Sequence, residues 1–190
     1  MRSKGFSLIE LMVVVAITGM LASVLVPSIS GLVDKAKAAK LVAVTDTLSL
    51  ACESYYSDTG GAAYEYAIEW YPAEGYHSLS FNLGVSGWAG PYIKSPLSRA
   101  DNPGDSAVWL YAGTNYWHTT AGGLGFDFNG DGAIDTTDSI TGNSIVFYNI
   151  NSAVARITEK LIDGSSINYN TGKAEYYSNY YFTIYLRGGR

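Results

Sequence analysis

The chain contains a single cysteine, Cys52, so it cannot form a disulfide bond within itself. A lone cysteine in a helical segment is expected to act as a small apolar side chain in a core. Histidine is almost as scarce. His77 and His118 are the only two in the sequence, and neither has a second histidine or cysteine at the spacing of a zinc site. We expect both imidazoles to be exposed or half-buried.

Motifs of common catalytic sites are also missing. No glycine-rich loop ends in Lys-Ser or Lys-Thr, the pair that cradles phosphate in nucleotide-binding proteins. Ser86 lies between Gly84 and Gly87, but Trp88 follows where a nucleophile elbow requires glycine. We therefore expect a protein that is not an enzyme.

The chain has fewer basic than acidic residues: 12 lysines and arginines against 17 aspartates and glutamates, which gives a net charge of −5. No basic stripe occurs after the lysines at positions 35, 37 and 40. Nucleic acid is therefore not expected as the main partner. The length of 190 residues allows one globular domain and an anchoring segment.

One long apolar run dominates the N-terminus. Between Phe6 and Val26 the only ionisable side chain is Glu10, and a helix of this length spans about 30 Å, one bilayer core. A carboxylate inside such a segment is costly and usually has a function. Arg2 and Lys4 precede the run, which predicts a cytoplasmic leader and an exported C-terminal part. The alternative is a plain membrane anchor with an incidental glutamate.

Three features of the N-terminus lie in register: the sequence KGFSLIEL at residues 4–11, the apolar run at 12–17, and Pro27. Together they resemble the start of the type IV pilins, a family that includes the type II secretion pseudopilins. The resemblance implies that a prepilin peptidase cuts between Gly5 and Phe6 and that the new Phe6 amine is N-methylated. It also implies that Glu10 pairs with the Phe6 amine of a neighbouring subunit in a filament.

After Pro27 the sequence becomes amphipathic. Apolar residues recur at alternating steps of three and four, at Leu41, Val44, Leu48, Ala51 and Tyr55. The turn-forming sequence DTGG at 58–61 follows, so we predict one helix from about residue 6 to residue 57. Gly19 and Pro27 are weak points in it, and by analogy with related pilins we expect helix to be lost locally between them on polymerisation.

The predicted organisation is a leader at 1–5, a transmembrane or filament-core segment at 6–27, the amphipathic half of the helix at 28–58 and a globular head at 59–190. Runs of β-branched and aromatic residues in the head predict strands at 107–112, 144–149 and 180–186. Helical spacing before Gly164 predicts a second, short helix at 151–163. The fold class is α+β, a long N-terminal helix packed on a C-terminal antiparallel sheet.

Two segments of the head also resemble members of this family. Residues 87–96, GWAGPYIKSP, are similar to the loop that follows the first helix in major pseudopilins and related pilins. Residues 157–172 are similar to a C-terminal segment of the same relatives. The Trp-Gly-Asn turn expected in the common major pseudopilins is absent from the sequence, which weakens the secretion-system interpretation.

Residues 127–138, DFNGDGAIDTTD, fit a calcium loop of the EF-hand and dockerin type. Calcium takes about six to eight oxygen ligands, which such a loop supplies from alternating positions. The expected ligands are the side chains of Asp127, Asn129, Asp131, Asp135 and Asp138 and the carbonyl of Ala133. A single loop of this kind predicts a structural ion that restrains a long loop of the head. The alternative is a simple Asn-Gly or Asp-Gly turn between two strands.

Tyrosine is abundant, with 16 residues concentrated at 64–76 and 169–185. Tyrosine suits strands with one wet face, which is the interpretation we favour. The alternative is a set of adhesive surface patches that contact other subunits or a substrate surface.

These observations favour a structural subunit that polymerises through its N-terminal helix into a helical filament, as a type IV pilin does. The resemblance implies a bacterial inner-membrane precursor, handled by prepilin peptidase and assembly machinery, and then an extracellular pilus. A type II secretion pseudopilin in a short periplasmic filament is one alternative. A membrane-anchored, calcium-dependent binding module is the other.

Overall fold

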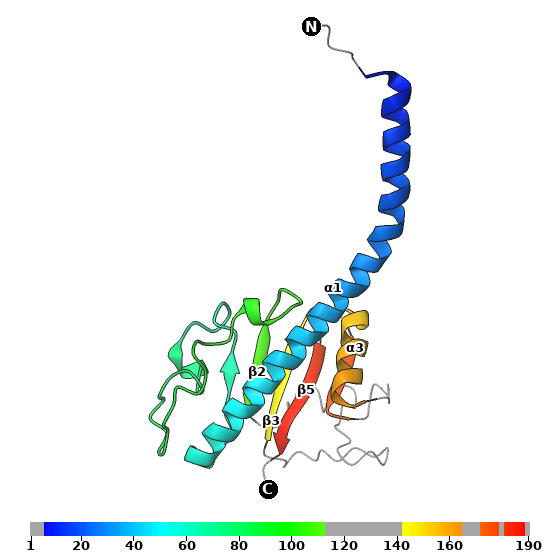
Figure 1. The fold of residues 1–190 in the computed structure, drawn as a ribbon. Coiled ribbons are helices and arrows are strands. Elements are labelled where there is room, and N and C mark those ends of the chain that lie inside the picture. Colours follow the sequence, from blue (N-terminus) through cyan, green and yellow to red (C-terminus); the bar gives the residue numbers. More distant parts are fainter. Residues whose placement is uncertain (1–5, 113–141, 165–171, 179–180, 189–190) are drawn as a thin grey trace.

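The structure, a computed structural model, describes residues 6–112, 142–164, 172–178 and 181–188. A long helix, α1 (Leu8–Thr59), projects from the head at its N-terminal end and crosses one face of a five-stranded sheet at its C-terminal end (Figure 1). A second helix, α3 (Ser152–Ile162), packs beside α1. The predicted α+β class is confirmed.

All neighbouring strands in the sheet are antiparallel, in the order β1-β2-β3-β5-β4. Their bounds are Glu65–Tyr66 for β1, Val108–Ala112 for β2, Gly142–Tyr148 for β3, Ala174–Ser178 for β4 and Tyr181–Gly188 for β5. The predicted strands at 107–112, 144–149 and 180–186 correspond to β2, β3 and β5. The pattern does not predict β1, which is only two residues long, or β4, whose sequence AEYYS mixes polar and aromatic residues without alternation.

The C-terminal half of α1 forms the base of the core. Leu41, Leu48, Ala51 and Tyr55 are buried against the sheet, and Val44 packs at the edge of the same cluster, so the predicted apolar stripe is confirmed. The helix ends at Gly60, whose φ of 71° is a left-handed conformation that glycine adopts without strain. It ends two residues beyond the predicted position because Asp58 and Thr59 still take helical backbone angles.

The N-terminal half of α1 continues without a break through Gly19 and Pro27 and curves as it leaves the head (Figure 1). This is the conformation of a single chain, so the local loss of helix expected on polymerisation stays a prediction. Across the described ranges, no helix contains an apolar stretch of the length required to span a bilayer.

The short helix predicted at 151–163 is confirmed as α3. The Asn151 side chain accepts a hydrogen bond from the backbone N–H of Val154 at 2.8 Å, which caps the first turn. Val154 and Ala155 are buried in the core, and Gly164 follows the helix with a φ of 86°. Cys52 is buried as expected, and burial raises the pKa of its thiol to about 12, which makes it unreactive.

The expectation for His77 is wrong. Its side chain is fully buried, and the residue itself directly follows the Glu74–Tyr76 turn and forms an isolated antiparallel bridge with Glu65 of β1. Nδ1 of His77 lies 3.0 Å from Oε1 of Glu65, and Nε2 donates to the Tyr71 carbonyl at 2.7 Å. A polar residue can be buried when each polar atom has a partner, and spacing along the sequence does not reveal that partner. His118 lies outside the described residues.

Candidate assembly site

The N-terminal half of α1 carries an apolar surface that none of the residues described by the structure covers. Phe6 is 83% exposed, and the apolar side chains that follow it are exposed all round the helix: Leu8, Ile9, Leu11, Met12, Val13, Val14, Val15, Ile17, Met20 and Leu21. A helix that is apolar on every side requires a dry environment, either lipid or other protein chains. This segment is therefore the first candidate for an assembly surface.

Ser7 and Glu10 form a reciprocal cap at the start of this segment. The Ser7 N–H donates to Oε2 of Glu10 at 2.8 Å, and the Glu10 N–H donates to the Ser7 hydroxyl at 3.3 Å. Such a capping box satisfies two of the backbone donors that every helix leaves free at its N-terminus. It holds the Glu10 carboxylate close to the point where cleavage after Gly5 would create a new amine.

The structure describes only some of the residues predicted for the site. Phe6 and Glu10 lie together in and next to the first turn of α1. Gly5 lies outside the described residues, as do all the predicted calcium ligands: Asp127, Asn129, Asp131, Ala133, Asp135 and Asp138. Among the residues that the structure does describe, no three acidic, histidine or cysteine side chains are grouped so that they could hold a metal ion.

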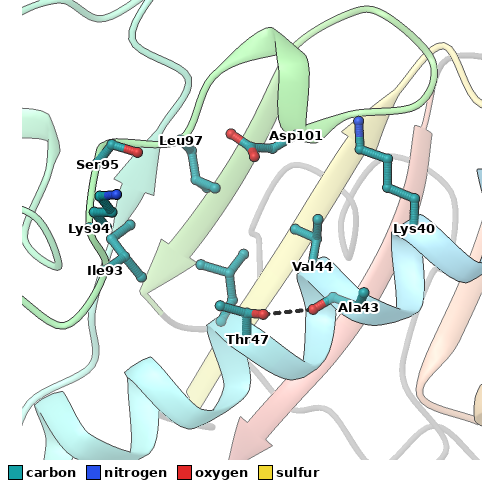
Figure 2. A pocket seen from close by; sticks show the side chains of 10 residues that line it. Lys40, Ala43, Val44, Thr47, Ile93, Lys94, Ser95, Leu97 and Asp101 are labelled. Carbon is teal, nitrogen blue, oxygen red and sulfur yellow. Dashed lines mark hydrogen bonds between the residues drawn. The ribbon is translucent and has the colours of Figure 1, made fainter.

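A groove of about 310 Å³ lies between α1 and the loop before β2, a feature that the sequence pattern does not predict (Figure 2). One wall consists of α1 residues: Lys40, Ala43, Val44, Thr47 and Leu48. The other consists of loop residues: Ile93, Lys94, Ser95, Leu97 and Asp101. The Lys40 amine donates to the Ala100 carbonyl, so it bridges the two walls at one end.

The loop is fixed against the end of α1 by close contacts. Gly87 has a φ of 85°, and a Cβ at this position would overlap the carbonyl oxygen of Asp58. The Tyr92 hydroxyl donates to the Asp58 carboxylate at 2.8 Å, and the Tyr92 ring packs edge-on against Tyr55. The segment singled out at 87–96 therefore shapes one wall of the groove.

Two buried glutamates lie in the opposite part of the head, on α3 and β4. Glu159 and Glu175 are each only 2% exposed. Among the described parts of the chain, neither oxygen of Glu159 nor Oε1 of Glu175 has a hydrogen-bond partner. Burial, together with the charge of Asp163, raises the pKa of Glu159 to about 7 and that of Glu175 to about 8.

Among the described residues, six tyrosines and Trp109 form a continuous cluster on the face of the sheet away from α1. Trp109 and Tyr111 alternate along β2 with the buried Val108 and Leu110, so their rings lie on the outer face. Ring centroids lie 4.6 Å apart for Trp109 and Tyr148, and the cluster continues through Tyr66, Tyr71, Tyr76, Tyr111 and Tyr181. Most of these rings are half-buried by one another, which agrees with tyrosine as a strand residue.

Comparison with known proteins identifies the N-terminal segment. Residues 1–26 match the model of the prokaryotic N-terminal methylation motif. The chain is 32% identical to the type IV major fimbrial protein FimA of Dichelobacter nodosus, over 73% of this chain and 68% of FimA. It is also 32% identical to the type II secretion system core protein G of Escherichia coli (strain K12), over 53% of this chain and 59% of that protein.

A shorter match, 49% identical, covers 26% of this chain and 31% of the type II secretion system core protein G of Dickeya chrysanthemi. No solved structure matches the chain. The chain belongs to the type IV pilin family, which includes the pseudopilins. Its function is that of a structural pilin subunit, and the members of this family are structural proteins rather than enzymes.

Proposed function

We propose that this chain is the subunit of an extracellular type IV pilus. The observation that carries the proposal is the similarity to a major fimbrial protein, which extends past the N-terminal helix over 73% of the chain. The matches to core protein G cover less of this chain, and the Trp-Gly-Asn turn of the common major pseudopilins is absent. No catalytic step is part of the proposal.

Assembly depends on moving one apolar helix between two dry environments. We propose that the precursor is held in the bacterial inner membrane by residues 6–27, with the leader at 1–5 on the cytoplasmic side. A prepilin peptidase removes the leader after Gly5, and the Phe6 amine is methylated. The assembly machinery then transfers the helix from lipid to the filament core, so its exposed apolar side chains stay away from water.

The Glu10 carboxylate selects the position of the incoming subunit. A carboxylate in a dry filament core costs several kcal/mol unless a cation neutralises it, and the Phe6 amine of a neighbouring copy is the cation that assembly supplies. This pairing is head-to-tail and does not close on itself, so it extends into a helical filament. The capping box supports the proposal because it already holds the carboxylate at the N-terminal end of α1.

The experiment that tests the function is deletion of the gene, with electron microscopy of cells and an assay of protein export. Loss of long surface fibres with normal export is the expected result. Normal fibres together with an export defect would identify the chain instead as a secretion pseudopilin, the alternative favoured by its similarity to core protein G. Mass spectrometry of the mature protein checks processing, because a chain that still begins at Met1 contradicts it.

We also propose that residues 127–138 bind a structural calcium ion. The support is the sequence alone, which places five oxygen-bearing side chains in the register of a calcium loop. In a chain without a disulfide, a bound ion would restrain a long loop and offset the mutual repulsion of four aspartates. The N-terminal match gives no support to the alternative of a calcium-dependent binding module, because it concerns assembly and processing.

A further inference from the structure

Two surfaces on the head half of α1 differ in character: one is an apolar groove with lysines at its ends, and the other is an exposed leucine between two acids. One is the groove between α1 and the loop before β2, described above (Figure 2). The other, which we call the acidic ridge, consists of Asp46, Leu50 and Glu53. Both surfaces belong to the same helix, which also carries the assembly surface at its N-terminal end.

The acidic ridge consists of one exposed apolar side chain, Leu50, between two acidic side chains. Leu50 is 67% exposed, although large apolar side chains elsewhere on this half of α1 are mostly buried. Asp46 and Glu53 lie four residues before and three residues after it, a spacing that places all three side chains on one face of the helix. All three are exposed, so the ridge points away from the core.

The groove has the opposite character. Its apolar lining comes from Val44 and Leu48 on α1 and from Ile93 and Leu97 on the loop. Lys40, whose amine donates one hydrogen bond to the Ala100 carbonyl, and Lys94 are both exposed, and Figure 2 shows them at opposite ends of the groove. The one acidic lining residue, Asp101, is already engaged, because its carboxylate accepts from the backbone N–H of Ser98 at 2.8 Å and from the Ser98 hydroxyl at 2.9 Å.

We propose that the groove is the docking site for the acidic ridge of a second copy of this chain. Leu50 of one subunit fills the apolar groove of its neighbour, and the flanking acids meet the lysines at the two ends. When the two α1 helices are parallel, as in a head-to-tail filament, Asp46 faces Lys40 and Glu53 faces Lys94. This inference rests on the proposed filament.

Two observations favour a second copy over other occupants. A groove of about 310 Å³ is at the lower limit of pockets that hold small organic molecules, roughly 300–1,000 Å³, whereas it readily holds an aliphatic side chain. The ridge also lies on α1, the same helix whose exposed apolar N-terminal half the proposed filament would cover. Because the groove and the ridge are different surfaces, the contact is heterologous and can repeat along a filament without closing.

The first test is site-directed cross-linking in filaments that carry Leu50→Cys together with Ser95→Cys, treated with a short thiol-reactive cross-linker. A ladder of covalent multimers is expected, and neither single variant should give one. The buried Cys52 thiol should remain silent in all variants. The matched control is Leu161→Cys with Ser95→Cys, because Leu161 is a 58% exposed leucine outside the ridge, on α3.

The second test is a charge exchange that does not depend on cross-linker geometry. Glu53→Lys and Lys94→Glu should each lower the yield of sheared filaments by about threefold, the size typical of one exposed ion pair. The double variant should recover most of the yield, because the pair is restored in reverse. Circular dichroism of the detergent-solubilised subunits checks that each variant folds.

The outcomes separate this contact from the proposed function. If the unaltered chain forms no filament, both the filament and the contact are overturned. A different result overturns only the contact. In that case filaments form normally, cysteines at positions 50 and 95 do not cross-link, and the losses from Glu53→Lys and Lys94→Glu simply add in the double variant. Cross-linking of the Leu161 control at the same rate would also overturn it.

Discussion

The Ser7 N–H and the Glu10 carboxylate are joined by a 2.8 Å hydrogen bond, so the acid proposed to pair with a neighbouring subunit already has a role within its own chain. It completes the first turn of α1, together with the return bond from the Glu10 N–H to the Ser7 hydroxyl. Glu10 therefore has two separable properties, a capping oxygen and a negative charge. Substitutions that remove one and keep the other can tell which of them assembly uses.

Glu10→Gln and Glu10→Ala should both abolish filaments, to about the same extent. Glutamine at this position keeps the capping box but has no charge to neutralise a neighbour's Phe6 amine. The measurement is the yield of sheared filaments relative to processed subunit in the membrane. Ser7→Ala is the control, because it loses about 1 kcal/mol of capping but keeps the charge, and it should assemble far better than Glu10→Gln. Normal filaments from Glu10→Gln would refute the electrostatic role.

Glu65→Ala should destabilise the head strongly. The carboxylate accepts from the Leu79 N–H at 3.0 Å and from the Ser80 hydroxyl at 2.9 Å, and it pairs with the buried His77 ring. Removing it leaves these buried groups unpaired, which costs about 3–5 kcal/mol. The measurement is urea unfolding followed by tryptophan fluorescence. Glu53→Ala, on the exposed surface of α1, should change the free energy of unfolding by less than about 0.5 kcal/mol.

The stability of the head should fall as the pH rises from about 5 to 8. Burial raises the pKa of Glu159 to about 7 and that of Glu175 to about 8, whereas both titrate near 4.5 in the unfolded chain. The folded state therefore holds protons that the unfolded state has released in this range, and each pKa unit corresponds to about 1.4 kcal/mol. Below about pH 4.5 both states are protonated, and the full stability is present.

The groups that face these two glutamates set the size of this effect. Asp163 raises both pKa values, Glu159 raises that of Glu175, and Arg156 lowers that of Glu159. The variant with both Glu159→Gln and Glu175→Gln should show a flatter dependence of the free energy of unfolding on pH. Urea titrations at pH 5, 6.5 and 8 would check this, since an equal slope in the variant and the unaltered chain would contradict the assignment.

Removing calcium should lower the thermal stability of the head. The loop at 127–138 is expected to fold around the ion, so binding stabilises the native state by mass action. Melting temperatures would be compared in chelator and in calcium at millimolar concentration. Asp127→Ala with Asp131→Ala should melt at the same temperature in both. A melting temperature of the unaltered chain that does not respond to chelator would exclude a structural ion.

Much of the helical architecture could be predicted from the sequence because helices depend on local patterns. The apolar stripe from Leu41 to Tyr55 and the stop at Gly164 are each visible within a few residues, and the structure confirms them. The strands β2, β3 and β5 were also predictable, since they concentrate β-branched and aromatic residues. Strand β4 was not, because its pairing with β5 depends on a neighbour and not on its own alternation.

The burial of four polar side chains could not be predicted from the sequence, for a related reason. His77 and Glu65 are twelve residues apart, and only the fold brings the ring and the carboxylate to 3.0 Å. The unpartnered acids Glu159 and Glu175 come from different elements, α3 and β4. Residue type alone favours an exposed position for all four, and the energy of burial depends on partners that are distant along the chain.

The N-terminal segment could be recognised from the sequence alone, because a processing motif, a lone carboxylate and an apolar run are linear signals read within 27 residues. The α+β class could be predicted in the same way, through periodicities that belong to single helices and strands. The surfaces that the head exposes follow instead from the folded arrangement. The groove beside Lys94 and the exposed position of Leu50 arise from how a loop and a helix pack, and that packing is set by contacts between residues far apart in the sequence.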